Sequence, residues 1–332
     1  MPDRFRVVTW NVENLARPDA SDAGALAAYE EKIRFLGEVV RTLDPDVLAL
    51  QEILDSDALN DLQTELSPAF AHAAEGLPGG RPIRVAFLSK LPFVEPQQHI
   101  EIFPIDPVFR INGATADGSE ELVTRMGRPA LRIRVETPVG VVDVITAHLK
   151  SKLLTYPRPG GGSAFSTSDE GLRTRVAAAA LLRRTVEAAT IRAAVNELLT
   201  GGPDRGLIVL GDLNDVPEAQ TSQILTGPAG SQIGTGGFHR PDQEDRDRLF
   251  NLAPAMPEER RYSRIHQGER ELLDQILVSE ELLPRGPDGK RRIPVADSHV
   301  DAYPMPSVSE DRAARADAVA PDHAPVSATF EL

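Results

Sequence analysis

Leu207-Ile208-Val209-Leu210-Gly211-Asp212-Leu213-Asn214-Asp215 is the stretch around which this chain is organised. Its first four residues form a short apolar run, which is typical of a fully buried strand. Side chains two residues apart in extended backbone point to the same side, so Asp212 and Asn214 can face one site where the strand ends. The same residues also fit a plain strand-to-loop turn, because Gly, Asp and Asn are ordinary turn formers.

Polar side chains recur at the ends of other predicted strands, which favours a shared site over a single turn. Asn11 and Glu13 follow Arg4–Thr9, Glu52 follows Val47–Leu50, His148 follows Val141–Thr146, Asp274 lies in Leu272–Val278, and Asp322 and His323 precede Val326–Phe330. Carboxylate and carboxamide oxygens suit a hard cation such as Mg²⁺ or Mn²⁺. The acids outnumber those that one Mg²⁺ needs, so some of them must have other roles. Histidines beside acids fit acid–base work or donation to a phosphate.

The remaining patterns predict helices, a hairpin and a long loop within one domain. We expect helices at Tyr29–Leu43, Asp57–Phe70 and Gly171–Leu199, a further strand at Val85–Leu88, and a strand at Ala130–Val135 that forms a hairpin with Val141–Thr146. The region from Glu95 to Gly127 is predicted to be irregular, and Leu153–Asp169, rich in Gly, Pro and Ser, to be a long loop without regular structure. No linker or short repeat divides the chain, so residues 1–332 are expected to form a single domain with its long loop at 153–169.

Composition narrows the class of protein. The 332 residues are 41% hydrophobic and 26% charged, as in soluble globular proteins, and no apolar run is long enough to span a bilayer. The absence of cysteine excludes disulfides, thiolate metal sites and cysteine nucleophiles. With a net charge of −14, no broad basic surface for nucleic acid is visible at the level of the whole chain, although a divalent cation in a carboxylate site can itself attract a phosphate. We see no signal peptide and leave the compartment open, as cytoplasmic or as secreted with the leader absent.

Six motifs in order resemble the endonuclease/exonuclease/phosphatase superfamily, which has the DNase-I-like fold. They are Thr9-Trp10-Asn11-Val12-Glu13-Asn14, Gln51-Glu52, His148-Leu149-Lys150-Ser151, Gly211-Asp212-Leu213-Asn214, Leu273-Asp274-Gln275-Ile276-Leu277-Val278 and Asp322-His323-Ala324-Pro325. Each motif alone is weak, but their order and spacing cover residues 9–325. The resemblance implies an α/β fold, a four-layer α/β sandwich in which two packed mixed β-sheets are flanked by helices. It also implies metal-dependent cleavage of phosphoester bonds at one rim.

The resemblance assigns roles by position. Glu52 looks like the principal metal ligand, with Asn11 and Glu13 beside it and Asp322 as a second metal-side carboxylate; Asp212 and Asn214 look like the groups that position the attacking water and the phosphate. His323 looks like the histidine that contacts the scissile phosphate or accepts the water's proton, Asp274 is similar to the acid that orients it, and His148 would donate to a phosphate oxygen, with Arg128 and Lys150 as phosphate contacts. The implied cofactor is Mg²⁺ or Mn²⁺, with Ca²⁺ as a candidate structural ion.

The leading hypothesis is a DNase-like nuclease that acts as a monomer on nucleic acid, without a stable protein partner. A phosphatase or phospholipase acting on inositol phosphates, sphingomyelin or a nucleotide is the alternative, and a binding module without catalysis is the third. Pro321 and Gln275 stand where the family commonly has Ser and an aromatic residue, which weakens an assignment to the DNA-repair branch. We expect the 153–169 loop to border the substrate groove and to bring Lys150, Lys152 and Arg158 to it; the alternative is a solvated insertion.

Overall fold

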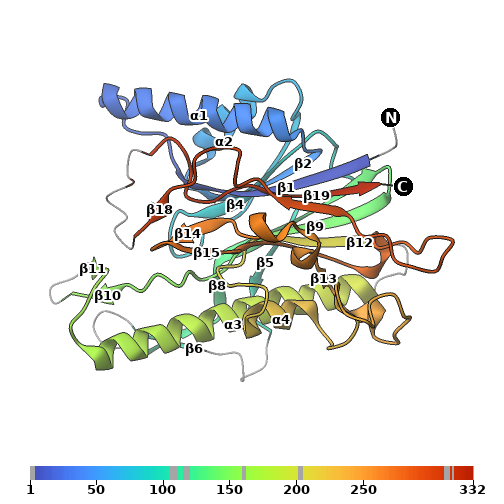
Figure 1. Cartoon of the computed structure of the whole chain (residues 1–332). Coiled ribbons are helices and arrows are strands. Elements are labelled where there is room, and N and C mark those ends of the chain that lie inside the picture. Colours follow the sequence, from blue (N-terminus) through green and yellow to red (C-terminus); the bar gives the residue numbers. More distant parts are fainter. Residues whose placement is uncertain are drawn as a thin grey trace.

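Two six-stranded sheets lie face to face at the centre of the molecule (Figure 1). The computed structural model describes residues 4–104, 111–114, 120–158, 162–200, 205–309, 315 and 318–331. The first sheet has the order β17 (Val295–Ser298), β19 (Val326–Glu331), β1 (Arg4–Leu15), β2 (Val47–Ile53), β4 (Arg84–Ser89) and β3 (His72–Glu75). The second sheet has the order β13 (Phe250–Asn251), β16 (Asp274–Val278), β12 (Gly206–Asp212), β9 (Gly140–His148), β8 (Arg125–Thr137) and β5 (Gln98–Ile102).

Helices cover the outer face of each sheet. Helices α1 (Ala23–Leu43) and α2 (Ser56–Glu65) lie on the first sheet, and α3 (Glu170–Thr200) and α4 (Gln220–Thr226) lie on the second (Figure 1). Asp22 begins α1 by accepting a hydrogen bond from Ala25 N, so a capping side chain fixes its start. The predicted four-layer α/β sandwich is therefore confirmed.

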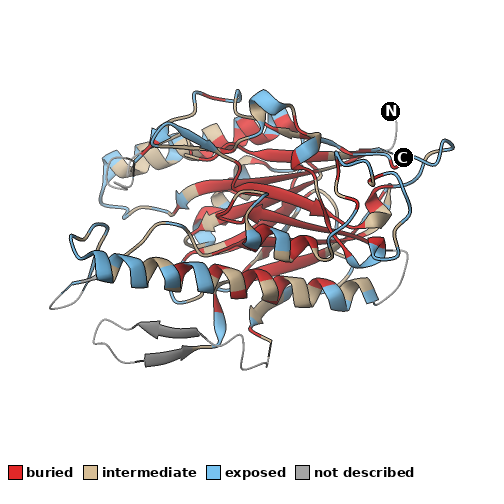
Figure 2. Cartoon of the chain, turned by 60° about the horizontal axis from the view of Figure 1, so that its bottom comes forward, coloured by how far each residue is buried: buried red, intermediate tan, exposed pale blue. Residues whose placement is uncertain are grey.

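Alternation along β1 shows how the sequence builds these layers. Phe5 and Val7 face the second sheet, whereas Val8, Trp10 and Val12 face the helices above the first sheet. Side chains of successive strand residues point to opposite faces, so a continuous apolar strand contributes side chains to two cores. A third core lies between the second sheet and α3, and Figure 2 shows the buried residues concentrated in the sheets.

Strand directions bring the predicted strand ends to one rim. β1 runs parallel to β2, and β9 runs parallel to β12. The strands of each pair therefore end at the same edge of their sheet, where the predicted site residues lie. β19 and β16 run antiparallel to their neighbours, so their beginnings reach the same rim. A buried polar contact joins the sheets close to it: the Gln51 amide nitrogen donates to Thr9 Oγ1 and to Thr146 Oγ1, at 3.0 Å each.

Several predictions about smaller elements were wrong. The helix predicted to reach Phe70 ends at Glu65, and the region predicted to be irregular contains β5, β6 (Ile111–Ala114), β7 (Glu120–Val123) and the start of β8. The long loop contains a two-stranded ladder of β10 (Tyr156–Pro157) and β11 (Ser163–Ala164), while its residues 159–161 lie outside the described part. A small sheet of β15 (Glu269–Glu271), β14 (Arg264–His266) and β18 (Ser307–Val308) was not predicted. The described residues include the short 3₁₀ helices η2 (Asp245–Asp247), η3 (Ala253–Ala255), η4 (Glu258–Arg260) and η5 (Glu280–Leu282).

None of the helices in the described part of the chain has the length and apolar character needed to cross a bilayer.

Candidate active site

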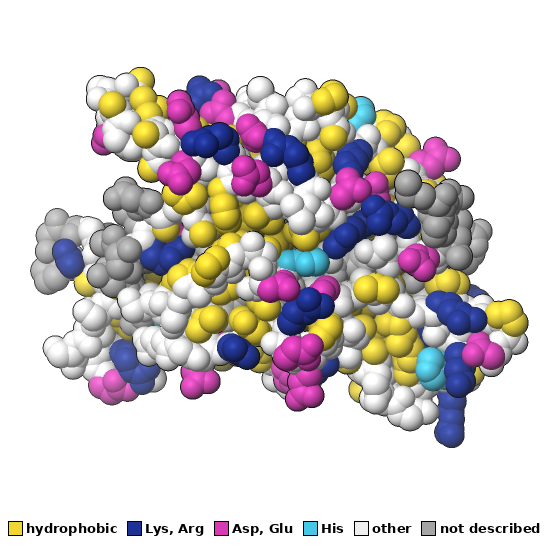
Figure 3. Space-filling view, turned by 45° about the horizontal axis from the view of Figure 1, so that its top comes forward, with side chains coloured by type: hydrophobic (Ala, Val, Ile, Leu, Met, Phe, Trp, Pro, Cys, Tyr) yellow, Lys and Arg dark blue, Asp and Glu magenta, His cyan; other side chains and the backbone are white. Residues whose placement is uncertain are grey.

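A cleft of about 930 Å³ opens at the rim where the strand ends meet. Hydrophobic and charged side chains lie side by side around this hollow (Figure 3). Nine of the eleven predicted site residues line the cleft directly, and the other two, Asn11 and Asp274, contact them. The residues that line it include Glu13, Glu52, Arg128, His148, Lys150, Asp212, Asn214, Asp322 and His323.

Lys150 is one of the nine predicted residues in this lining, and its ammonium group is held by nearby backbone carbonyls. Its Nζ donates to Ser151 O and Leu153 O, at 3.0 and 3.2 Å. Lys152 pairs with Glu271 at 2.8 Å, and Arg158 is exposed outside the lining. Of the three cations expected at the groove, Lys152 is therefore paired with an acid and Arg158 lies outside the lining. Lys150 adds its charge to the cleft, although its ammonium donors are used by backbone carbonyls, which does not favour it as a direct phosphate contact.

Asp212 lies buried in the cleft and is held by two hydrogen bonds. Its Oδ1 accepts from Asn214 N at 2.9 Å, and its Oδ2 accepts from Asn11 Nδ2 at 3.0 Å. Burial, with Asp274 nearby, raises the pKa of Asp212 to about 6, although His323 and Asn11 oppose the shift. Gly211 precedes it at φ +140°, and a Cβ there would lie 2.0 Å from Ala147 O, so only glycine fits this turn.

Glu52 faces the cleft at the end of β2, in the left-handed conformation at φ +65°. The pairing of β1 with β2 shifts register between Asn11 and Leu15, and such an irregularity re-aims side chains. Glu52 accepts hydrogen bonds from Asn14 N at 2.9 Å and from Asn11 Nδ2 at 3.3 Å. Because Asn11 Oδ1 accepts from Glu13 N at 3.0 Å, the Asn11 amide nitrogen is the end that faces both Glu52 and Asp212. The geometry therefore favours Asn11 as a residue that positions the carboxylates, in place of the expected metal ligand.

His323 is buried beside Asp212 and is oriented from two directions. Its Nδ1 donates to Asp274 Oδ2 at 2.6 Å, and its backbone carbonyl accepts from Trp10 Nε1 at 2.7 Å and from the Tyr303 hydroxyl. Burial acts to lower the pKa of His323, but the carboxylates of Asp274, Asp322 and Asp212 outweigh it and raise the pKa to about 10. His323 is therefore an imidazolium at neutral pH.

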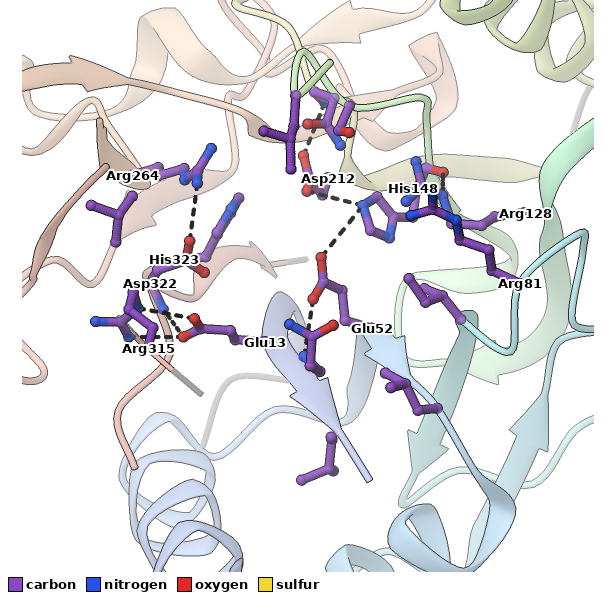
Figure 4. A pocket seen from close by; sticks show the side chains of 18 of the residues that line it. Glu13, Glu52, Arg81, Arg128, His148, Asp212, Arg264, Arg315, Asp322 and His323 are labelled. Carbon is purple, nitrogen blue, oxygen red and sulfur yellow. Dashed lines mark hydrogen bonds and ion pairs between the residues drawn. The ribbon is translucent and has the colours of Figure 1, made fainter. Parts of the chain in front are cut away.

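His148 lies on the other side of Asp212. Its Nε2 is 3.4 Å from Asp212 Oδ2 and 3.9 Å from Glu52 Oε1. Arg128 fixes the backbone here, because its Nε donates to His148 O at 2.9 Å and its Nη2 donates to Leu149 O. Asn214 Nδ2 donates to the same Leu149 carbonyl at 3.0 Å. This side of the cleft is thus built from a histidine and an arginine held by one segment of backbone (Figure 4).

Glu13 and Asp322 have arginine partners that sequence reasoning missed. Glu13 accepts from Arg315 Nε at 2.9 Å and Nη2 at 2.8 Å, and Asp322 Oδ2 lies 3.1 Å from Arg264 Nη2. A carboxylate committed to a guanidinium is a poor ligand for a cation, so the geometry does not favour the metal roles expected for these two acids. No local pattern marks Arg264 or Arg315, because their partners lie far away in the sequence.

The remaining carboxylates decide where a divalent cation fits. Among the described acids that line the cleft, Glu52 and Asp212 are the two without an ion pair to lysine or arginine. A separate triad of Asp212, Asp274 and His323 places ligand atoms within 4.8 Å of one another. That triad is a poor cation site, since metal-binding histidine must be neutral and His323 is an imidazolium hydrogen-bonded to Asp274. The donor set fits a hard cation at Glu52, on the open side of Asp212.

Comparisons with known proteins agree with this architecture. The family model described as "Endonuclease/Exonuclease/phosphatase family" matches residues 8–297. A search of curated proteins gave no match. A truncated TDP2 from Caenorhabditis elegans has a TM-score of 0.54 at 16% identity, with 99% of this chain and 98% of that chain covered. The human Nocturnin catalytic domain with bound sulfate has a TM-score of 0.57 at 15% identity, with 100% and 95% covered. A beta toxin from Staphylococcus aureus has a TM-score of 0.53 at 16% identity, with 98% and 99% covered. At these identities the solved structures show a shared fold.

Proposed function

Because the chain belongs to the endonuclease/exonuclease/phosphatase family, whose members are phosphoric ester hydrolases that are generally metal-dependent, we propose that it is a phosphodiesterase. More narrowly, we propose a DNase-like nuclease that hydrolyses nucleic-acid phosphodiester bonds with Mg²⁺ or Mn²⁺. The catalytic groups in this proposal are Asp212, Asn214, His148 and His323, with Asp274 positioning His323 and Glu52 holding the cation.

The observation that carries the proposal is a pair of oppositely charged groups, Asp212 and His323, side by side in one cleft. Asp212 titrates near neutral pH, and His323 stays cationic beside it. A base is most effective when its pKa lies near the working pH, so Asp212 suits removal of a proton from water. The fixed imidazolium suits stabilisation of the negative charge that develops on phosphate oxygens.

The chemistry follows from these positions. The water oxygen bonds to phosphorus while the bond from phosphorus to the leaving oxygen breaks. The water's proton passes to Asp212, and the leaving oxygen takes a proton from solvent. His323 and His148 donate to phosphate oxygens from opposite sides, and Asn214 orients the phosphate. When bound at Glu52, a divalent cation supplies further positive charge to the phosphate. No serine or cysteine nucleophile is needed.

The charge of the cleft supports an anionic substrate. The whole chain carries a net charge of −14, yet the described cleft lining has more cations than acids. The cations are Lys32, Arg81, Arg128, Lys150, Lys152, Arg183, Arg264 and Arg315, and the acids are Glu13, Glu52, Glu187, Asp212, Glu271 and Asp322. Focusing of opposite charge in a cleft raises the local concentration of a charged substrate.

One observation favours a second candidate, a phospholipase-type phosphodiesterase. Part of the cleft lining is apolar and includes Leu15, Ala16, Pro18, Ala25 and Ala28. Such a wall can contact an apolar group of a lipid phosphodiester as well as a nucleobase. Sphingomyelin therefore belongs in the first substrate panel.

The proposal is tested by one panel of substrates. Supercoiled plasmid, linear duplex DNA, single-stranded DNA, RNA, inositol phosphates and sphingomyelin are incubated with the protein in Mg²⁺, in Mn²⁺ and in excess chelator. We expect cleavage of a polynucleotide that needs the cation and is lost in Asp212→Asn. Asp301→Asn, at an exposed aspartate outside the cleft lining, is the matched control. Turnover of sphingomyelin alone would favour the second candidate, and undiminished cleavage in chelator would refute the metal requirement.

A further inference from the structure

Four cations gather on the side of the cleft opposite Arg315. They are Arg81, Arg128, Lys150 and Arg183, which we call the cationic corner. Figure 4 shows Arg81 and Arg128 next to His148, across the cleft from Arg315 and Asp322. The four residues come from the loop before β4, from β8, from the end of β9 and from α3, so the corner is assembled by the tertiary fold.

A buried carboxylate holds the corner together. Glu187 on α3 accepts from Lys150 N at 2.7 Å and from Gly127 N at 3.0 Å, and Arg183 Nε lies 3.4 Å from it. Glu187 is 1% exposed, so it ties β8 and β9 to α3 without reaching solvent. Arg128 is fixed separately by the carbonyls of His148 and Leu149. The backbone that carries these cations is thus fixed before any ligand binds.

Arg81 is the accessible member of the corner. It is exposed, and no hydrogen bond or ion pair ties its guanidinium to another residue of the described chain. The loop that carries it is packed tightly on β8, because a Cβ at Gly79 would lie 1.8 Å from Gly127 O. Arg81 therefore extends from a well-anchored loop with its donors available to a ligand.

The charges in the corner do not balance. Glu187 pairs with Arg183, and Glu52 and Asp212 also act electrostatically on Arg128, so three acids stand against four cations. Burial and then Arg128, Arg81 and Arg183 lower the pKa of Lys150 to about 8, with only Glu187 opposing them. Like charges held together favour the binding of an anion, and guanidinium groups match phosphate oxygens in geometry.

We propose that the cationic corner is a subsite for a second phosphate, distinct from the phosphate that is cleaved beside Asp212 and His323. The inference rests on the proposed function in taking the cleaved group to be a phosphodiester. It narrows the substrate class to molecules with two phosphates joined by a short linker such as a sugar, as in a polynucleotide or a nucleoside bisphosphate. A single-phosphate ester leaves the corner empty and binds more weakly.

Calorimetric titration of two ligands tests this subsite. Thymidine 3′,5′-bisphosphate and thymidine 5′-monophosphate are titrated separately into the Asp212→Asn protein in Mg²⁺, so that no turnover occurs. Charge-assisted hydrogen bonds from Arg81 should make the bisphosphate bind about tenfold or more tightly than the monophosphate. Adding Arg81→Ala should bring the ratio of the two affinities close to one, and Arg81→Lys should restore part of it. The matched control is Arg240→Ala, which removes an exposed arginine outside the cleft lining.

The outcomes separate the subsite from the proposed function. Equal affinities for the two ligands, no binding of either, or a ratio that survives Arg81→Ala would each overturn the subsite. A ratio that depends on Arg81, in a protein that cleaves no phosphodiester in the substrate panel, would leave the subsite standing and refute the proposed function. If the protein cleaves phosphodiesters but binds the bisphosphate and the monophosphate with equal affinity, the proposed function stands and the subsite is refuted.

Discussion

Asp274→Asn is expected to shift the alkaline limit of activity, because Asp274 is the first of the carboxylates that keep His323 cationic. The substitution keeps the shape of the side chain and removes the charge that lies 2.6 Å from His323 Nδ1. The pKa of His323 is raised to about 10 by Asp274, Asp322 and Asp212 together, against the opposing effect of burial. One opposite charge at this range contributes about 1–3 pKa units, or about 1.4–4 kcal/mol.

The assay is the pH dependence of kcat/KM, which reports the ionisations of the free enzyme. In the wild type, activity should fall at high pH as His323 loses its proton near pH 10, and in Asp274→Asn this fall should begin about 1–3 pH units lower. The sign follows from the chemistry, because the charged imidazolium is the active form. A titration of ¹³C-labelled histidine by NMR should show the same displacement of the His323 pKa.

Two results would refute this reasoning. An alkaline limb that stays in place in Asp274→Asn would show that His323 does not act as a cation held by Asp274. A large loss of metal affinity in the same variant would make Asp274 a metal ligand. In a double-mutant cycle, Asp274→Asn and His323→Ala should be strongly non-additive, since both remove one interaction. Asp297→Asn, which removes an aspartate outside the cleft lining, serves as the control.

Three further outcomes are expected. Glu52→Gln should keep the wild-type unfolding free energy but require a higher Mg²⁺ concentration for half-maximal activity; an unchanged metal dependence would place the cation elsewhere. Gly211→Ala should destabilise the protein by roughly 3 kcal/mol or more in urea unfolding, because its Cβ would collide with Ala147 O, and a near-neutral effect would contradict the turn geometry. Burial and Arg6 lower the pKa of His299 to about 4. As the pH falls, the unfolded chain therefore protonates this histidine before the folded protein does. The contribution of His299 to stability should be complete above about pH 6.5 and fall by up to about 3 kcal/mol towards pH 4. Urea titrations at several pH values should show a smaller acid loss in His299→Gln, and an equal loss would assign the effect to other groups.

The central strands could be predicted from the sequence and the edge strands could not. The four strands at the edges of the two large sheets are β17, β3, β13 and β5, and none of them was predicted. An edge strand has solvent on one side and is short or polar, so it lacks the apolar run that marks a buried strand. Thus Gln98–Ile102 has no fully buried residue and falls in a region predicted to be irregular, whereas Gly206–Asp212 is buried throughout and contains the apolar run Leu207–Leu210 that predicts a strand.

The residues of the candidate site also divide into those that the sequence predicts and those that it does not. Asp212, Glu52 and His323 could be identified because each stands beside an apolar run whose end the sequence marks. The arginine partners of Glu13 and Asp322 could not be predicted. Whether an acid binds a metal ion or pairs with an arginine depends on tertiary packing. Arg81 gave no signal for the same reason, since its loop looks like any Gly- and Pro-rich turn.

The pairing of β1 with β19 sets when the candidate site can form during synthesis of the chain. β1 pairs in register with β19, from Arg4 opposite Glu331 to Thr9 opposite Val326, and His323 directly precedes β19. A ribosome adds about 5–20 residues per second, so β1 waits tens of seconds for this partner. Throughout that time the nascent chain lacks His323, so the candidate site is incomplete. The cleft can therefore take its full set of side chains only after β19 has been made and has paired with β1.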